Sequence, residues 1–354
     1  MKQYDSLMKK CIELAKQAQG ETSPNPLVGC VVLNDSGEII STGYHKKCGE
    51  NHAERDALLK LDNANNCTLV VNLEPCSHYG KTPPCADLII KKGVKRVVYG
   101  MKDVNPIVAG NGLKKLIDAE IEVIGPVLED ECKKLNEIFI KNQVEHKTFV
   151  ALKAATTIDG KIATSTNDSK WITSNSARVE VRNIRKRYDA ILTSSSTVLT
   201  DNPTMEHKCK VILDRKLKTN PQMTIYKQGK ILVFHSLKNQ SNLANDNIQY
   251  IYAPTLNNGL DIEFILDKLY ELGITSVLVE AGGKLNGSFL PYVDRLYHFV
   301  APKILGDNNG KSCFYGKDVE RISNCTNLKF DSVEFFPPDI LVNYVKVWRN
   351  EILC

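Results

Sequence analysis

The sequence lacks any apolar run long enough to cross a bilayer. The longest runs, residues 27–33 and 274–279, fall far short of the ~20 apolar residues of a membrane-spanning helix. The N-terminal residues lead into an amphipathic stretch rather than an uninterrupted apolar one, so no signal peptide is expected. We therefore expect no membrane partner.

Charge of one sign and aromatic residues are also scarce. The net charge is +5 across 354 residues, and aromatic residues make up 7% of the chain. Because nucleic-acid binding relies on a clustered basic face and on aromatic stacking, no nucleic-acid partner is expected. The mild positive charge fits an anionic small molecule.

Cysteine is present, but in no pattern typical of a disulfide framework. Eleven cysteines, an odd number, are spread over the whole chain. We interpret most of them as small apolar residues in a reducing compartment, and we expect a cytoplasmic location.

A chain of this length is long for a single hydrophobic core, which favours two domains.

Apolar periodicity predicts two α/β units that are joined near residues 145–147. Strands are expected at 27–33, 39–43, 67–73, 94–100, 121–124, 149–156, 190–194, 211–214, 231–235 and 274–280. Helices are expected at 7–20, 53–61, 85–92, 113–119, 176–187 and 262–272, with one longer polar helix at 128–144. Strands that alternate with helices of this length indicate sheets covered on both faces.

Two short segments of the first unit carry the clearest chemistry. His52-Ala53-Glu54 and Pro75-Cys76, followed by Cys85, supply an imidazole, two thiolates and a carboxylate. Three protein ligands leave one position of a tetrahedral zinc open for water, and the order H-x-E…P-C…C is the signature of zinc deaminases. We predict that His52, Cys76 and Cys85 bind Zn²⁺ and that Glu54 is the catalytic proton carrier. A closed structural zinc site would need a fourth ligand, and no C-x-x-C pair supplies one.

Weaker signals lie elsewhere in the chain. Asn25 stands between two prolines, where an extended backbone could aim its amide at a ligand, and a plain strand-entry turn is an equal alternative. Glu280 ends a buried strand, and Gly282, Gly283 and Gly287 begin the next helix, where backbone N–H groups can bind a phosphate. Because this is not a G-x-G-x-x-G motif, a tight strand–helix turn explains it equally well.

Three arginines share one face of the helix expected at 176–187. Arg178, Arg182 and Arg185 are spaced for the same side of an α-helix. For Arg178 and Arg182 we favour a solvated basic face.

Together these motifs resemble a known family. Asn25-Pro26-x-Val28-Gly29, the His52 and Cys76 motifs and the long insert before Cys85 resemble the deaminase half of the bifunctional riboflavin-biosynthesis family. That family joins a diaminohydroxyphosphoribosylaminopyrimidine deaminase to a 5-amino-6-(5-phosphoribosylamino)uracil reductase. The blocks at 152–163, 169–174, 192–203 and 279–283 resemble its reductase half, so the resemblance spans nearly the whole chain.

The resemblance implies an α/β fold with an N-terminal three-layer cytidine-deaminase-like domain over residues 1–145. A C-terminal dihydrofolate-reductase-like α/β domain is implied over residues 148–354. The implied activity is zinc-dependent hydrolytic deamination of 2,5-diamino-6-(5-phosphoribosylamino)pyrimidin-4(3H)-one. NADPH-dependent reduction of the ribosyl chain to ribityl then gives 5-amino-6-(5-phosphoribitylamino)uracil. A homo-oligomer is also implied. The family uses NADPH as the reductant, although nothing in the residues themselves excludes NADH.

Site residues follow from the same resemblance. The implied substrate contacts in the first domain are Asn25, His45, Ser77 and Lys81, and in the second they are Ser169, Arg185, Met205, Lys208 and Glu280. The implied cofactor contacts are Ala155, Trp171, Thr197, Asp201, Gly282, Gly283, Lys284, Leu285, Asn286, Gly287 and Ser288.

For His45 and Lys208, the sequence itself qualifies what the resemblance implies. For His45, the residues alone leave a surface histidine near a turn as an equal alternative. Lys208 stands in a region where the family commonly has an arginine, and it keeps the charge without the bidentate fork, so weaker or rearranged phosphate binding is expected.

Other readings stay open on the residues alone. A deaminase with a nucleic-acid-binding second domain would act on tRNA or DNA. A non-catalytic zinc-stabilised module would depend on its metal for folding only. No residue of the second half is an evident general acid.

Overall fold

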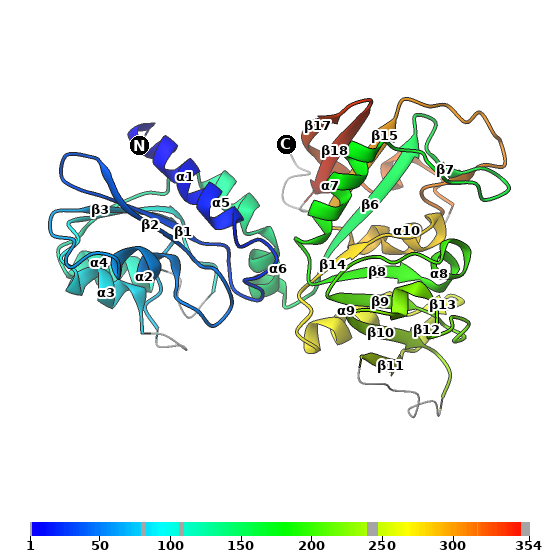
Figure 1. Cartoon of the computed structure of the whole chain (residues 1–354), viewed down its shortest axis with the longest axis horizontal. Coiled ribbons are helices and arrows are strands. Elements are labelled where there is room, and N and C mark those ends of the chain that lie inside the picture. Colours follow the sequence, from blue (N-terminus) through cyan, green and yellow to red (C-terminus); the bar gives the residue numbers. More distant parts are fainter. Residues whose placement is uncertain (1, 79–82, 106–109, 239–246, 317, 348–354) are drawn as a thin grey trace. The chain divides into compact units, whose positions relative to one another are not determined.

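The computed structural model of the chain describes residues 2–78, 83–105, 110–238, 247–316 and 318–347. The chain forms two compact units, Met1–His146 and Lys147–Cys354 (Figure 1). Within the described residues, no helix is both long enough and apolar enough to cross a membrane.

The first unit is a five-stranded sheet between two layers of helices (Figure 1). The strands in spatial order are β2 (Ile39–Tyr44), β1 (Gly29–Leu33), β3 (Thr68–Leu73), β4 (Arg96–Met101) and β5 (Glu122–Ile124). β1 runs antiparallel to both of its neighbours, whereas β3, β4 and β5 are parallel. Helices α1 (Asp5–Lys16) and α5 (Glu129–Leu135) cover one face, and α2 (Ala53–Leu58), α3 (Cys85–Lys91) and α4 (Asn111–Asp118) cover the other.

Close helix–strand packing fixes the start of α2. A Cβ atom at Gly43 of β2 would lie 2.4 Å from the carbonyl oxygen of Ala53, so only glycine permits this approach. The N-terminal end of α2, which carries His52 and Glu54, is therefore pressed against the sheet.

The single polar helix expected at 128–144 is wrong, because the structure has two helices there. Asn136 separates α5 from α6 (Glu137–Glu145) with a non-helical backbone. Its side-chain oxygen accepts from Leu27 N at 2.7 Å, and its Nδ2 donates to Leu27 O at 3.1 Å. Asparagine side chains compete well with helical backbone in this way, and here the pairing ties the break to the segment that enters β1.

The second unit is built on a nine-stranded sheet (Figure 1). In spatial order its strands are β11 (Ile248–Tyr252), β10 (Lys230–His235), β9 (Cys209–Leu213), β8 (Ala190–Ser194), β14 (Ser276–Val279), β6 (Phe149–Thr157), β15 (Arg295–Ala301), β18 (Asp339–Lys346) and β17 (Leu328–Phe336). The strands from β11 to β15 are parallel, and β18 and β17 complete the sheet antiparallel. Short ladders join β7 (Lys161–Ala163) to β16 (Lys311–Ser312), and β12 (Thr255–Leu256) to β13 (Gly259–Leu260).

Helices cover both faces of this sheet. The helices α9 (Ile262–Glu271) and α10 (Gly283–Phe289) contribute to an apolar core with β6 and β14 on one face. On the other face, α8 (Ser195–Asp201) packs over β8, β9 and β10, and α7 (Asn175–Arg185) brings Arg185 to the residue that follows β14. Ser174, Ser194 and Asp261 cap the N-termini of α7, α8 and α9 with their side-chain oxygens, as these residue types favour.

The α/β architecture expected from the sequence is confirmed in both units. The antiparallel end of the second sheet, β15, β18 and β17, was not anticipated. No element was assigned from periodicity beyond residue 288, although β15 is largely buried and β18 alternates between buried and half-buried positions. Only β17, which leaves much of its length exposed, lacks a clear inward–outward alternation.

Two candidate active sites

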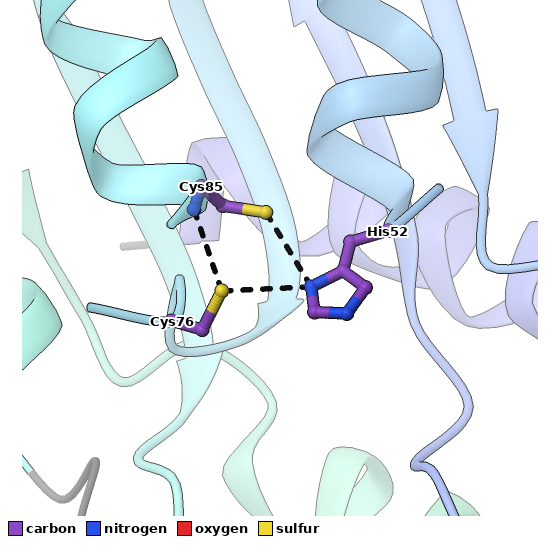
Figure 2. Close-up of side chains that lie close together, drawn as sticks. All are labelled: His52, Cys76 and Cys85. Atoms are coloured by element: carbon purple, nitrogen blue, oxygen red, sulfur yellow. Dashed lines mark hydrogen bonds between the residues drawn. The ribbon is translucent and has the colours of Figure 1, made fainter. Parts of the chain in front are cut away.

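Three metal-binding side chains converge in the first unit. His52 precedes α2, Cys76 follows β3, and Cys85 begins α3. His52 Nδ1 lies 3.5 Å from Cys76 Sγ and 3.5 Å from Cys85 Sγ, and Figure 2 shows both sulfurs pointing toward the same ring nitrogen. The three ligand atoms lie within 4.8 Å of one another, and no other group of this kind occurs in the described part of the chain. One nitrogen and two sulfurs around a common point suit zinc.

The surrounding groups prepare Cys76 for a cation. A hydrogen bond with Cys85 and another with His52 hold the pKa of the Cys76 thiol well below its usual range, against the effect of burial. The backbone N–H of Cys85, at the start of α3, donates to Cys76 Sγ at 3.3 Å. Backbone N–H groups at a helix start favour a thiolate, so Cys76 is pre-charged for metal binding.

Glu54 lies in the first turn of α2, two residues after His52. Its side chain is 3% exposed, and burial raises its pKa to about 7. A carboxyl group with a pKa near neutrality can accept and return a proton during one reaction cycle. The structure therefore places a suitable proton carrier beside the three ligands.

His45 is buried, not on the surface, which excludes the alternative left open by the sequence. Its ring is 2% exposed and meets the His52 ring edge-on at 5.4 Å. Nδ1 lies 3.0 Å from Asn51 O, so it carries the hydrogen, and Nε2 accepts from Asn25 Nδ2 at 3.1 Å. Burial lowers the pKa of His45, which favours this neutral form.

Asn25 reaches this group from a turn. Its backbone N–H donates to Thr22 O at 2.8 Å, so the segment is a strand-entry turn rather than a fully extended one. The turn nevertheless brings the Asn25 amide to His45, next to the metal ligands. Ser77 is half-buried directly after Cys76. Lys81 lies outside the described residues.

Sequence reasoning missed Glu74, directly before Pro75-Cys76. Its buried carboxylate accepts hydrogen bonds from the backbone N–H groups of Asp103, Gly110, Gly112 and Leu113. It therefore joins the Cys76 segment to the start of α4. The available signal was an acidic residue directly after a fully buried strand.

The second unit brings three charged side chains together. Arg185 Nε donates to Glu280 Oε1 at 2.6 Å, and Arg185 Nη2 donates to Glu280 Oε2 at 3.0 Å. Lys153 Nζ lies 3.3 Å from Glu280 Oε2. Burial alone would raise the pKa of Glu280, but the charges of Lys153 and Arg185 outweigh it and bring the pKa to about 2. Lys153 was not among the expected site residues, although a charged residue inside an apolar strand was a signal for it.

Strand register explains how these groups meet. Leu152 of β6 and Leu192 of β8 both pair with Val279 of β14. The next residue along each strand, Lys153, Thr193 and Glu280, therefore points to the same face of the sheet. Thr193 is 1% exposed, and its hydroxyl has no hydrogen-bond partner in the described structure.

The expected cofactor contacts gather at the carboxyl ends of neighbouring strands. α8, with Thr197 and Asp201, follows β8, and α10 follows the adjacent β14. Ala155 lies near the end of β6, in the same part of the sheet. Crevices at the carboxyl ends of parallel strands are the usual cofactor sites of such sheets.

The glycines of α10 have two different roles. A Cβ atom at Gly283 would lie 2.1 Å from Ser312 O, and one at Gly287 would lie 1.7 Å from Tyr315 O, so packing against residues 312–315 requires both. Gly282, by contrast, has open space around it and precedes a helix start without a side-chain cap. In this segment Lys284 and Ser288 are exposed, Leu285 is half-buried, and buried Asn286 donates from Nδ2 to Cys313 O.

The remaining expected contacts lie on loops. Met205 is buried in the segment after α8, Lys208 is exposed just before β9, and Ser169 is half-buried before Trp171. Trp171 is exposed, and the Arg178 guanidinium lies 4.4 Å from the centre of its ring. The expectation that Arg178 belongs to a solvated basic face is therefore wrong, whereas Arg182 is exposed as expected.

Comparison with known proteins covers both units. The family model described as the RibD C-terminal domain matches residues 148–342, and the cytidine and deoxycytidylate deaminase zinc-binding region matches residues 1–101. Riboflavin biosynthesis protein RibD of Actinobacillus pleuropneumoniae is 38% identical over 96% of this chain and 94% of its own length. The RibD protein of Escherichia coli is 34% identical over 97% of this chain and 99% of its own.

Solved structures show the same likeness. A diaminohydroxyphosphoribosylaminopyrimidine deaminase/5-amino-6-(5-phosphoribosylamino)uracil reductase from Thermotoga maritima is 40% identical, with a TM-score of 0.87 over 97% of this chain and 99% of its own. RibD of Acinetobacter baumannii is 33% identical, with a TM-score of 0.86 over 98% of this chain and 99% of its own.

Proposed function

Because the chain belongs to the RibD family of bifunctional deaminases and reductases of riboflavin biosynthesis, we propose that its two clusters of side chains are the two active sites. Residues 1–145 form the zinc-dependent deaminase domain, and residues 148–354 form the NADPH-dependent reductase domain. The substrate is 2,5-diamino-6-(5-phosphoribosylamino)pyrimidin-4(3H)-one, and the final product is 5-amino-6-(5-phosphoribitylamino)uracil.

The observation that carries the deaminase assignment is the meeting of His52, Cys76 and Cys85 beside the buried carboxyl group of Glu54. These three side chains would hold zinc, which lowers the pKa of a water in its open position. Glu54, with a pKa near 7, accepts one proton of the water and gives it to the pyrimidine ring nitrogen, and then carries the remaining hydroxyl proton to the amino group, which leaves as ammonia. His45 and Asn25 hold one another in place and bind the substrate with Ser77 and Lys81.

In the reductase domain, Arg185, Lys153 and Glu280 bind and polarise the substrate. The N–H groups of Arg185 that do not face Glu280 remain able to bind the substrate phosphate, together with Lys208. The Glu280 carboxylate accepts from the ribosyl hydroxyls. Ser169 and Met205 complete this side of the substrate site.

Lys153 is the general acid of the reductase site, a role for which the sequence showed no evident residue. Reduction at C1′ requires a proton on the ring oxygen as the ribosylamine opens. The Lys153 ammonium, held beside Glu280, is positioned to donate it. NADPH supplies the hydride.

The cofactor lies along the carboxyl ends of β8 and β14. Its contacts are Thr197 and Asp201 of α8, Ala155 of β6, Trp171, and the segment from Gly282 to Ser288. The uncapped start of α10 supports this position for its phosphates.

The protein assembles as a homo-oligomer in the cytoplasm. β17 is an edge strand, and Phe330, Val333 and Phe335 leave large apolar side chains exposed along it. Unpaired edges with exposed apolar residues invite pairing with another chain, and a second copy of β17 offers the same edge. The cytoplasmic location is supported by the cysteines of the described residues, none of which is joined in a disulfide.

One assay separates the two activities. Supplying the diaminopyrimidinone phosphate without NADPH should release ammonia alone, and adding NADPH should then start cofactor oxidation. A zinc-stabilised binding module would release no ammonia, and an enzyme specific for tRNA or DNA would not act on the free nucleotide.

A further inference from the structure

We propose that Arg178 is a positioning residue of the reductase site, which holds the indole of Trp171 in the orientation that receives the nicotinamide cofactor. The inference rests on the proposed role of Trp171 as a cofactor contact. It adds a residue that neither the motifs nor the resemblance assign to the site.

A single guanidinium makes two contacts with the same segment. Arg178 Cζ lies 4.4 Å from the centre of the Trp171 ring, well inside the range of a cation–π contact. Arg178 Nη1 also donates to Thr173 O at 2.7 Å. Arg178 therefore holds both the indole face and the backbone two residues further on.

Burial does not fix the indole. Trp171 is 63% exposed, so most of its surface faces solvent rather than a packed core. In the described part of the chain, the guanidinium of Arg178 is the group that contacts the Trp171 ring. Because the guanidinium covers one face of this largely exposed indole, a planar ligand can stack on the opposite face.

Other contacts fix the backbone but leave the side chain to Arg178. Lys303 Nζ donates to Trp171 O at 2.7 Å, and Ser174 N donates to Asp339 Oδ2 at 2.6 Å. These bonds anchor the segment to β18 and to the loop after β15. They place the Cα of Trp171, while the orientation of its ring depends on the guanidinium.

The arginines of α7 therefore divide their roles. Arg178 stacks on Trp171 near the start of the helix, and Arg185 pairs with Glu280 at its end. Arg182 lies between them and is exposed. It offers a control with the same charge on the same helix.

The test compares Arg178→Gln with Arg182→Gln in the full-length protein. Loss of the stacking and of the bond to Thr173 should raise the KM for NADPH roughly tenfold. The kcat at saturating NADPH and the rate of ammonia release should stay near wild type. Arg182→Gln should change none of these values.

Two further readouts separate positioning from a merely structural role. Arg178→Lys keeps the charge but lacks the planar fork, so it should not restore the KM. Tryptophan fluorescence should be quenched by NADPH in the wild type, and in Arg178→Gln the quenching should need a higher NADPH concentration. Full rescue by lysine, or an unchanged KM in Arg178→Gln, would overturn the proposal.

Trp171→Ala distinguishes this inference from the proposed cofactor site. If Trp171→Ala raises the KM for NADPH and Arg178→Gln does not, the positioning role alone is wrong. If Trp171→Ala leaves the KM unchanged, Trp171 is not a cofactor contact, and both assignments fall together.

Discussion

Arg185 and Glu280 face one another through a bidentate pair, with Nε 2.6 Å from Oε1 and Nη2 3.0 Å from Oε2. The carboxylate is 5% exposed, and Lys153 Nζ adds a third contact at 3.3 Å. A buried carboxylate that is this well partnered stays charged. The pair therefore links the stability of the reductase domain to its substrate site.

Arg185→Gln should disable reduction and weaken the second domain. Removing one partner of a buried ion pair costs about 3–5 kcal/mol, and Lys153 should limit the loss to the lower end of that range. Urea unfolding followed by circular dichroism measures the stability, and NADPH oxidation measures the activity. Arg182→Gln, on the same helix, should be close to wild type in both, and equal behaviour of the two variants would contradict the role of the pair.

Stability should fall in acid because of Glu280. The folded protein holds the pKa of this carboxyl at about 2, below its ordinary value of 4.5, so protonation favours the unfolded chain. The contribution, about 3 kcal/mol, is complete above roughly pH 4.5 and is lost as the pH falls toward 2. Unfolding free energies measured for the wild type and Glu280→Gln should converge over that range. If the unfolding free energies of the wild type and Glu280→Gln instead changed in parallel with pH, Lys153 and Arg185 would not be lowering the pKa of Glu280.

Glu54→Gln should abolish deamination without removing zinc. The variant keeps the size of the side chain but cannot carry a proton, so ammonia release should fall by at least about 10²-fold. Zinc content and NADPH oxidation with deaminated substrate should be unchanged. Asp56→Asn is the matched control, because Asp56 lies on the same helix and pairs with Lys46 and Lys60 instead. A wild-type deamination rate in Glu54→Gln would remove Glu54 from the mechanism.

Thr193→Val should not destabilise the protein. The Thr193 hydroxyl is buried and has no hydrogen-bond partner among the described residues, so a methyl group of the same size removes a desolvation cost of about 1 kcal/mol. Thr156→Val is the matched control, since the Thr156 hydroxyl lies 2.9 Å from His298 Nε2. That variant should lose about 1 kcal/mol in urea unfolding. A larger loss at Thr193 than at Thr156 would show that the Thr193 hydroxyl is paired in solution.

Phe335→Lys should disrupt the oligomer. Phe335 is among the most exposed apolar side chains of the edge strand β17, and a charge at that position opposes pairing of two such edges. Analytical ultracentrifugation should show a smaller species for the variant, and ammonia release should persist. Lys329→Glu, on the same strand, changes a charge at an already polar position and should leave the assembly intact.

The sequence was sufficient to predict the candidate zinc ligands because their motifs are short and local. His52 and Glu54 are two residues apart, and Cys76 and Cys85 stand at a strand end and a helix start. A histidine and a glutamate two residues apart, followed by two cysteines in this order, are typical of few sites other than those of zinc deaminases. The alternation of strands and helices likewise followed from short-range periodicity.

Longer-range relationships were not predictable in this way. The break at Asn136 depends on the backbone of Leu27, which is 109 positions away in the chain. The partnership of Lys153 with Glu280 depends on the register of β6 against β14. The stacking of Arg178 on Trp171 depends on the path of the loop before α7.

The sequence by itself determined the candidate metal ligands, the proposed proton carrier and the order of the two α/β units, because residue type and local spacing encode them. Only the tertiary structure decided which charges neutralise one another and which polar groups stay unpaired. Those outcomes depend on burial and on distances between segments that the chain brings together only when it folds. Glu280 shows the difference most clearly, since its position was evident from the sequence while its two cationic partners emerged from the fold.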